Sequence, residues 1–169
     1  MPHADELERI YDAHAQAIFA FALNLTRNES DTRDVIQDLF RRLATRPELL
    51  REVRDERGFL LRMAHNLAID LIRRRARERA TEAIVAATGV LFAPVADPDE
   101  SAFRQQLEAA LAGLPEEQRA IVHLKLWEGM TFERIAETLA IPINTAASRY
   151  RYGLDKLRVR LRPIYEEIQ

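Results

Sequence analysis

The sequence TFERIAETLAIPINTAASRYRYGLDKL, residues 131–157, indicates a helix, a short break and a second helix. Ile135 and Leu139 recur at a four-residue step, which predicts one buried face on the first helix. Thr131 is suited to cap its start, and Pro142 ends it. The second helix, from about residue 144, has apolar or small residues at a matching spacing: Ala146, Tyr150, Gly153 and Leu157. Two helices across a tight turn form a helix-turn-helix.

A helix-turn-helix often binds DNA. The N-terminal part of its second helix then enters the major groove, where the four base pairs present different edges. On this basis Ser148, Arg151 and Tyr152 are the favoured base or groove contacts. For this segment by itself, a solvated helical hairpin with an Arg-rich second member is the alternative.

The residues before this motif predict two more helices of the same domain. An apolar face that includes Phe103 and Leu111 begins near Ser101, and Gly113 follows in the usual C-terminal position. Pro115 fits the first turn of the next helix, which the following acidic residues suit through the helix dipole. A C-terminal helical domain is therefore expected over residues 101–169.

The N-terminal part predicts a separate three-helix domain over residues 1–79. Apolar stripes of helical period run over residues 5–26, from the proposed N-cap Asp31 to about residue 45, and over residues 57–79. The charged residues 46–56 suit an irregular or briefly helical connection. We expect the three stripes to share one core.

Residues 80–100 are the expected linker between the two domains. The helical stripe breaks up here: a short helix over residues 83–90 is compatible with the sequence, but Gly89, Pro94 and Pro98 interrupt any continuation. The predicted fold is therefore all-α, with two small helical domains joined by a linker and a helix-turn-helix in the second.

Charge is distributed unevenly along the 169 residues, although the net charge is only −2. Residues 1–79 hold 15 basic and 14 acidic side chains, residues 80–117 hold 1 and 7, and residues 118–169 hold 9 and 6. The acidic middle therefore masks two basic ends. Because local clusters of basic residues bind phosphate, this distribution favours a nucleic-acid partner.

Several classes of function are disfavoured. The chain contains no cysteine, which excludes disulfides and thiolate metal sites. The four histidines have no close metal-ligand spacing, and no phosphate-binding glycine loop or nucleophile motif occurs. We expect no cofactor, no metal and no enzymatic activity. With no signal-like start and no long apolar run, a cytoplasmic protein without membrane insertion is expected.

Two sets of motifs carry a family resemblance. Residues 32–43, TRDVIQDLFRRL, and residues 57–75, RGFLLRMAHNLAIDLIRRR, resemble the second conserved region of extracytoplasmic-function (ECF) sigma factors of the sigma-70 family. The fourth region of that family is resembled by LPEEQRAIV (114–122), EGMTFERIAETLAI (128–141), TAASR (145–149) and LDKLR (154–158). Both sets occur in the family's order, with a linker between them.

The resemblance implies a factor that binds core RNA polymerase and directs promoter recognition, DNA melting and transcription initiation. It implies an anti-sigma factor as a further partner. The implied polymerase-binding residues are Asp34, Gln37, Asp38, Phe40 and Arg41. The implied contacts to the −10 promoter element are Phe59, Arg62, Asn66, Arg73, Arg74, Arg75 and Arg77, beside a base-capturing loop at residues 46–56. The implied −35 contacts are Thr131, Asn144, Thr145, Ser148, Arg149, Arg151 and Tyr152.

The sequence departs from the family pattern at a few positions. Phe59 stands where the family often has Trp, and Ala140 where glycine commonly forms the turn. Ala146 replaces a bulkier residue and Ala147 an often basic one, which puts one base or phosphate contact in doubt.

The same residues allow alternative interpretations. A DNA-binding regulator of the response-regulator type has a similar helix-turn-helix, but its receiver domain would alternate strands and helices, which residues 1–79 do not. A helical interaction module would use both arginine clusters for solvation. The acids of the second predicted helix could belong to an ordinary solvated face, and Phe59 could belong to the core.

Overall fold

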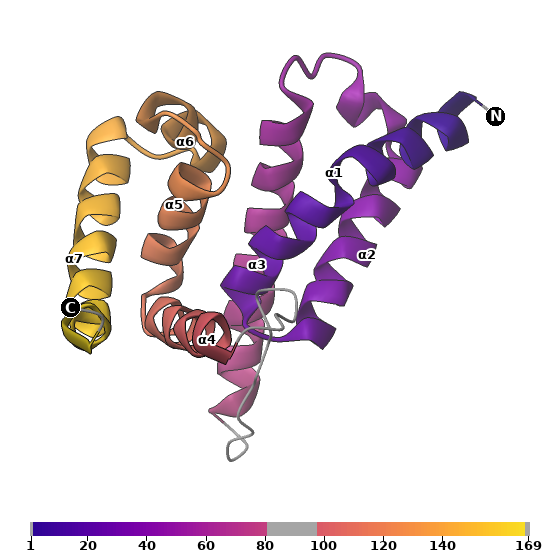
Figure 1. Ribbon diagram of the computed structural model, residues 1–169. Helices are drawn as coiled ribbons and strands as arrows, with labels where there is room; N and C mark the ends of the chain where they lie inside the picture. Colours follow the sequence, from indigo (N-terminus) through magenta and orange to yellow (C-terminus); the bar gives the residue numbers. More distant parts are fainter. Residues whose placement is uncertain (1, 81–97, 168–169) are drawn as a thin grey trace. The chain divides into compact units, whose positions relative to one another are not determined.

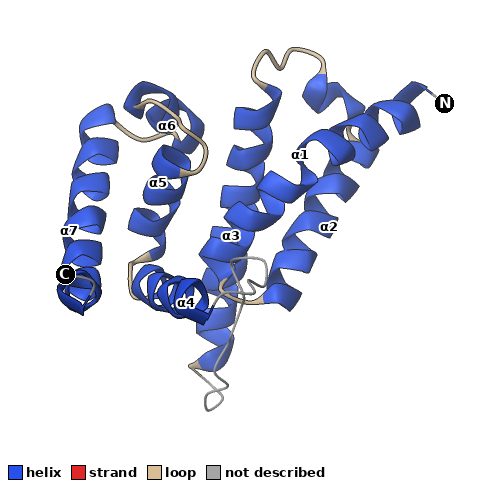
Figure 2. Ribbon diagram, viewed as in Figure 1, coloured by secondary structure: helices blue, strands red, loops and turns tan. Residues whose placement is uncertain are grey.

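The computed structural model describes residues 2–80 and 98–167. Within these residues all regular elements are helices, as Figures 1 and 2 show. The chain divides into two compact units, residues 1–89 and 90–169. The all-α prediction with a helix-turn-helix in the C-terminal part is confirmed. Most of the expected linker, including the compatible short helix over residues 83–90, lies outside the described residues.

Three long helices build the first unit: α1 (Pro2–Thr26), α2 (Glu29–Thr45) and α3 (Glu56–Arg79), with the short 3-10 helix η1 (Pro47–Leu50) after α2. Each long helix packs against the other two. Their apolar stripes meet in one core, which includes the fully buried side chains of Ile10, Ile18, Phe21, Leu25, Leu39, Leu43, Leu60 and Leu61. The expected shared core is therefore present.

The turn between α1 and α2 places the N-cap of α2 three residues before the predicted one. Asn28 is the N-cap of α2, because its side-chain oxygen accepts a hydrogen bond from the Asp31 amide at 2.9 Å. Asp31 instead lies within the first turn of α2 and accepts hydrogen bonds from the Arg75 guanidinium at 3.3 Å. The prediction of Asp31 as the cap was wrong, since both residue types can cap a helix and the sequence does not rank them here.

Four helices build the second unit: α4 (Pro98–Ala112), α5 (Glu116–Leu126), α6 (Phe132–Leu139) and α7 (Ile143–Glu167). Helix α4 begins slightly earlier than expected, and Pro115 is the N-cap of α5 rather than a residue of its first turn. Helix α7 packs against each of α4, α5 and α6. The helix that carries the predicted DNA contacts is therefore also the one around which this unit is assembled.

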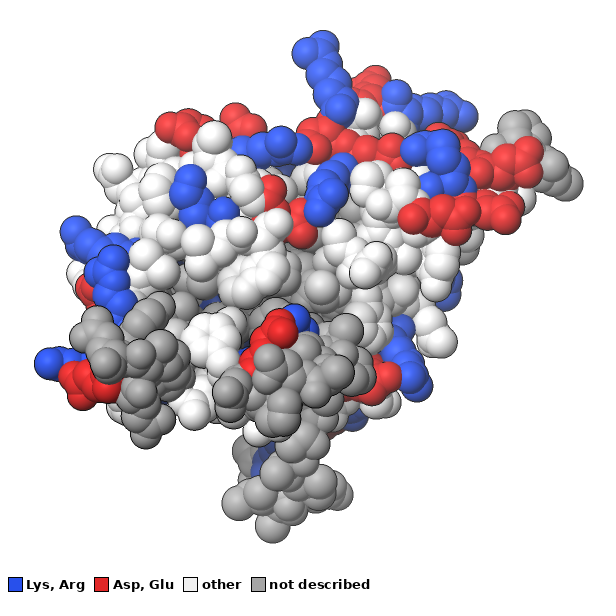
Figure 3. Space-filling view, in the orientation of Figure 1, with Lys and Arg blue, Asp and Glu red and all other residues white. Residues whose placement is uncertain are grey.

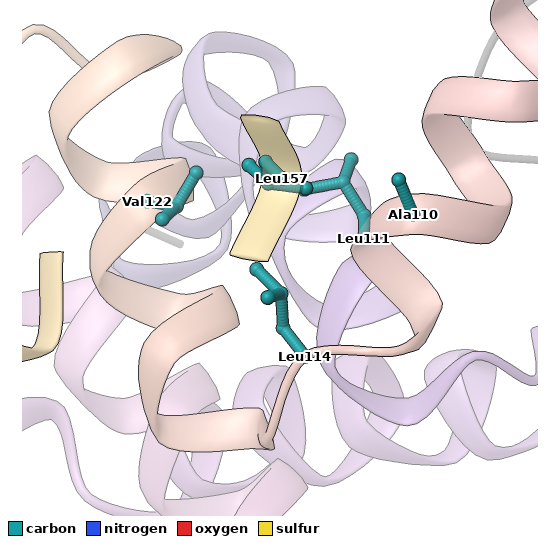
Figure 4. Close-up of a cluster of buried hydrophobic side chains, with 5 residues drawn as sticks. All are labelled: Ala110, Leu111, Leu114, Val122 and Leu157. Atoms are coloured by element: carbon teal, nitrogen blue, oxygen red, sulfur yellow. The ribbon is translucent and has the colours of Figure 1, made fainter. Parts of the chain in front are cut away.

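The core of the second unit joins α4, α5 and α7. Figure 4 shows Leu157 of α7 pointing into the space between Leu111 of α4 and Val122 of α5. Two arginines close the C-terminal end of α4, because Arg119 and Arg160 donate hydrogen bonds at 3.1 Å to the carbonyl oxygens of residues 112 and 110. These carbonyls lack helical partners, so the guanidinium groups satisfy them.

The turn of the helix-turn-helix contains a left-handed residue without glycine. Ala140 has φ 54° and ψ 49°, and the Ile141 amide donates to the Ala136 carbonyl at 3.0 Å, as in a Schellman motif. A Cβ atom in this region costs roughly 1–2 kcal/mol. The departure from the family's usual glycine therefore keeps the turn geometry at an energetic cost.

Replacing Ala140 with glycine should stabilise the second unit, because glycine adopts a positive φ without the Cβ clash. The expected gain is up to ~1 kcal/mol in the free energy of unfolding, part of the strain relief being offset by the entropy of glycine in the unfolded chain. Urea unfolding followed by the fluorescence of Trp127, the single tryptophan of the chain, measures it. Ala109→Gly, the same change inside α4, should destabilise instead; a loss of stability in both variants would contradict the strain at Ala140.

His123 is a buried titratable group in the second unit. Its side chain is 3% exposed, and its ring stacks on Trp127 with the ring centroids 5.4 Å apart. Burial lowers the pKa of His123 to about 4, although the Glu128 carboxylate, 4.0 Å from Nε2, partly opposes this shift. The neutral imidazole is therefore the folded form at neutral pH.

Acid should destabilise the second unit through His123. Below pH 6.5 the unfolded chain binds a proton at this residue, whereas the folded state does not until pH falls to about 4. The free energy of unfolding should therefore fall by ~3 kcal/mol over this range. Urea unfolding followed by Trp127 fluorescence at pH 7.5 and 5.0 tests this. His123→Leu should show a smaller loss; an equal loss in both proteins would assign the effect to other groups.

Candidate nucleic-acid and protein interfaces

A groove runs along the outer side of α1 and α2. It has a volume of about 700 Å³, and its walls are mainly apolar: Leu7, Tyr11, Phe19, Ile36, Phe40 and Ala44, with Glu8, Arg33, Gln37 and Arg41 beside them. The rings of Tyr11 and Phe40 lie 5.1 Å apart and join its two walls. We name this feature the α1–α2 groove. Three predicted polymerase-binding residues, Gln37, Phe40 and Arg41, line it.

A second hollow lies between α2 and α3, with a volume of about 610 Å³. The other two predicted polymerase-binding residues, Asp34 and Asp38, line it together with Arg74 and Arg77 of α3. Asp38 forms ion pairs with Arg41 and, at 3.0 Å, with Arg42. The hydrogen bond from Arg41 is the main cause of the lowered pKa of Asp38, so this carboxylate stays charged at neutral pH. The five predicted residues thus share α2 and line two hollows, with Arg41 lining both.

The outer face of α3 gathers most of the predicted −10 contacts. Its start is fixed by Asp55, whose side chain accepts a hydrogen bond from the Gly58 amide at 3.0 Å. At 3.6 residues per turn, Phe59, Arg62, Asn66, Arg73 and Arg77 fall on one side of this helix. Arg62, Asn66, Arg73, Arg74 and Arg77 are exposed, and Phe59 is half-buried.

Arg75 differs from the other arginines of this cluster. Its guanidinium lies 3.1 Å from Glu78 and 3.3 Å from Asp31 of α2. The hydrogen bond that Arg75 donates to Glu78 and the nearby Asp31 charge raise the pKa of Arg75. Because it points away from the face of Arg62, Arg73 and Arg77, this arginine ties α3 to the start of α2.

The outer face of α7 gathers the predicted −35 contacts. Asn144, Arg151 and Tyr152 are exposed, whereas Thr145, Ser148 and Arg149 are half-buried. The Arg151 guanidinium lies over the Tyr152 ring, 5.3 Å from its centroid. The remaining predicted contact, Thr131, caps α6, because its hydroxyl accepts a hydrogen bond from the Arg134 amide at 3.2 Å.

Arg149 again stands apart from its neighbours. Its guanidinium lies 2.9 Å from the Glu117 carboxylate of α5. Glu117 is one of the two acidic residues after Pro115 that suit the start of a helix, and its pairing with a residue 32 positions later has no sequence signal. Tyr11 falls within the apolar stripe that periodicity predicts for residues 5–26, but the residue is 53% exposed.

Other kinds of site find little support within the described residues. No group of three or more His, Asp or Glu side chains there is arranged to hold a metal ion. None of the helices in the described part of the chain is long and apolar enough to cross a membrane.

Two family models match the chain. Residues 10–78 match Sigma-70 region 2, and residues 104–157 match Sigma-70, region 4. The first match covers the three long helices of the first unit, and the second covers the helix-turn-helix. Both models therefore coincide with the exposed faces described above.

Individual proteins are similar over nearly the whole chain. The ECF RNA polymerase sigma factor SigE of Mycolicibacterium smegmatis is 35% identical over 94% of this chain. The match covers 61% of the length of SigE. SigL of Mycobacterium tuberculosis is 31% identical over 94% of this chain and 90% of SigL. The ferric citrate uptake sigma factor FecI of Escherichia coli is 30% identical over 82% of this chain and 80% of FecI.

The fold has a solved counterpart. The sigma factor RpoE of Bartonella quintana, determined in complex with the anti-sigma factor NepR, matches with a TM-score of 0.73 at 22% identity. The match covers 94% of this chain and 96% of that one. With both regions in order and relatives above 30% identity, the chain belongs to the sigma-70 family, among the extracytoplasmic-function RNA polymerase sigma factors.

Proposed function

We propose that this chain is a transcription initiation factor that divides its work between its two units. The first unit binds core RNA polymerase and opens the −10 element, and the second reads the −35 duplex. The observation that carries this proposal is the presence of an exposed, basic helix face on each unit, on α3 and on α7. Each face can hold a separate stretch of one promoter, so residues 1–79 and 101–169 act as the two functional domains.

The polymerase contact is assigned to α2. Protein interfaces gain most of their affinity from aromatic and arginine side chains that become desolvated in a pocket. The α1–α2 groove offers this chemistry, because Tyr11 and Phe40 lie against each other and Arg41 is at its edge. Figure 3 shows uncharged side chains over much of the visible face of this unit. Asp34 and Asp38, on the α3 side of α2, supply charges that can pair with basic residues of the partner.

Promoter opening is assigned to α3 and the connection before it. Opening requires capture of extruded bases and attraction of the freed strand, which aromatic and basic side chains provide without covalent chemistry. The face formed by Arg62, Asn66, Arg73 and Arg77 supplies the positive charge, and Phe59 offers a partly exposed ring beside it. Arg74, which lines the α2–α3 hollow, extends this surface.

Recognition of the −35 element is assigned to the first turns of α7. Asn144, Ser148 and Arg151 lie on the side opposite the buried Ala146, Gly153 and Leu157, which is the side a major groove can reach. Asn and Arg make bidentate contacts to adenine and guanine, respectively. Thr131, which caps α6, and Thr145 and Tyr152 of α7 are assigned to flanking phosphates.

This role needs no catalytic residue and no cofactor from the chain itself. It places the protein in the cytoplasm, where bacterial transcription occurs. The B. quintana neighbour was solved with an anti-sigma factor. We propose that an anti-sigma factor also regulates this chain. Such a partner would cover the α2 face or the α7 face and so compete with polymerase or with DNA.

Run-off transcription with core polymerase and genomic promoter fragments tests the proposed function. The chain should direct specific transcripts that core polymerase does not make. Arg151→Ala should reduce their yield about tenfold or more, because one base or phosphate contact is worth roughly 1–3 kcal/mol. Arg158→Ala, farther along the same helix, is the matched control and should act less. If the same transcripts appear without the chain, the role in initiation is contradicted. If the two variants have equal effects, the assignment of −35 recognition to the first turns of α7 is contradicted.

Phe40→Ala should weaken binding to core polymerase about tenfold or more, since it removes an aromatic anchor from the α1–α2 groove. Fluorescence anisotropy of the labelled chain titrated with core polymerase measures this affinity. Phe103→Ala makes the same change at an exposed phenylalanine of α4 and should have little effect. If Phe40→Ala binds like the unaltered chain, the polymerase surface lies elsewhere.

A further inference from the structure

Arg149 occupies the flank of α7 that turns toward α5. Each residue of an α-helix is rotated by about 100° from the previous one. By this geometry Arg149 lies beside the buried Gly153, one turn later, and away from Asn144, Ser148 and Arg151. Its ion pair with Glu117 follows the same direction, with 2.9 Å between the Arg149 guanidinium and the Glu117 carboxylate.

Helices α5 and α7 approach closely just beyond this pair. A Cβ atom at Gly153 would lie 2.9 Å from Val122 Cγ2 and 3.6 Å from the Gln118 Cβ. A side chain at this position would therefore push the two helices apart. Because Gln118 follows Glu117 directly, the glycine contact and the ion pair lie along the same seam between α5 and α7.

We infer that Glu117 is a positioning residue for promoter recognition, because it holds the Arg149 guanidinium against α5 and away from the DNA phosphates. This inference rests on the proposed −35 role of α7. The family resemblance implies that Arg149 contacts DNA, whereas this inference gives it a structural role, in which it holds α7 against α5. Together with the close approach at Gly153, this ion pair supports the rotation of α7 that the burial of Ala146 and Leu157 sets, with Asn144, Ser148 and Arg151 facing outward.

The charge of the pair also matters for selectivity. The Glu117 side chain is 51% exposed and that of Arg149 is 31% exposed, so the pair lies at the surface, on the flank of α7 that turns toward α5. An arginine released there would bind any phosphate, whatever the base sequence. Glu117 therefore suppresses sequence-independent binding while it holds the helix that reads sequence.

Glu117→Gln tests this inference, because it keeps the size of the side chain and removes its charge. The holoenzyme reconstituted from core polymerase and each variant is titrated over a series of salt concentrations. The two probes are a promoter fragment recovered by run-off transcription and a random-sequence duplex of equal length. The control is Glu116→Gln, the same charge change one residue earlier on α5.

The released Arg149 should make random-duplex binding of Glu117→Gln several-fold tighter at low salt. The slope of the logarithm of the DNA-binding constant against the logarithm of the salt concentration should become steeper by about 0.9, the value for one phosphate contact. The ratio of promoter to random-duplex affinity should fall about fivefold or more. Arg149→Met should leave the salt slope unchanged, and Glu117→Gln combined with Arg149→Met should lose the added slope. Glu116→Gln should leave slope and ratio close to those of the unaltered chain.

The opposite pattern overturns the inference. If Arg149→Met flattens the salt slope by about 0.9 and Glu117→Gln leaves slope and ratio unchanged, Arg149 contacts a phosphate directly. Equal effects of Glu116→Gln and Glu117→Gln would make the effect one of general charge and would also overturn it. Failure of the unaltered holoenzyme to prefer the promoter fragment would instead count against the proposed function, while the random-duplex slopes still decide the role of Glu117. Circular dichroism of each variant verifies its folding.

Discussion

Burial of one apolar stripe per helix is the constraint on which the rest of this structure depends. In the first unit the stripes of α1, α2 and α3 meet around fully buried residues such as Phe21, Leu39 and Leu60. Once these stripes face inward, the remaining sides of α2 and α3 have to face outward. The outward positions of Asp34 and Arg73 are thus a consequence of core formation. The same holds in the second unit, where the burial of Ala146 and Leu157 turns Asn144 and Arg151 outward.

The arginines of this chain perform two different tasks, and their partners separate the two. Arg75 pairs with Asp31 and Glu78, Arg119 and Arg160 satisfy the carbonyls at the end of α4, and Arg149 pairs with Glu117. These guanidinium groups hold helices together. The exposed Arg62, Arg73 and Arg77 share one face of α3 and suit phosphate binding. The basic clusters of the sequence are therefore mixtures, in which neighbouring arginines support the fold and the proposed DNA surface.

The second unit places recognition and stability in the same helix. Helix α7 contributes Leu157 to the core and also presents the predicted −35 contacts. Its entry is set by the strained Ala140 turn, and its approach to α5 by Gly153. Because packing restricts how α7 can rotate or shift, the fold itself orients the groups that would read DNA. Such preorganisation lowers the entropy that binding would otherwise cost.

The helical class, the helix-turn-helix and the family could be predicted from the sequence, because periodicity, helix-breaking residues and motif order are local properties of the chain. The sequence also determined which helices carry the predicted contacts. It could not rank Asn28 above Asp31 as the cap of α2, since both residue types cap helices. Tertiary structure decided which members of each cluster are engaged in the fold: the pairs of Arg75 with Asp31 and of Arg149 with Glu117 join residues 44 and 32 positions apart. It also decided that Tyr11 and Phe40 meet in a groove. Contacts of this kind depend on how helices pack, and no local pattern encodes them.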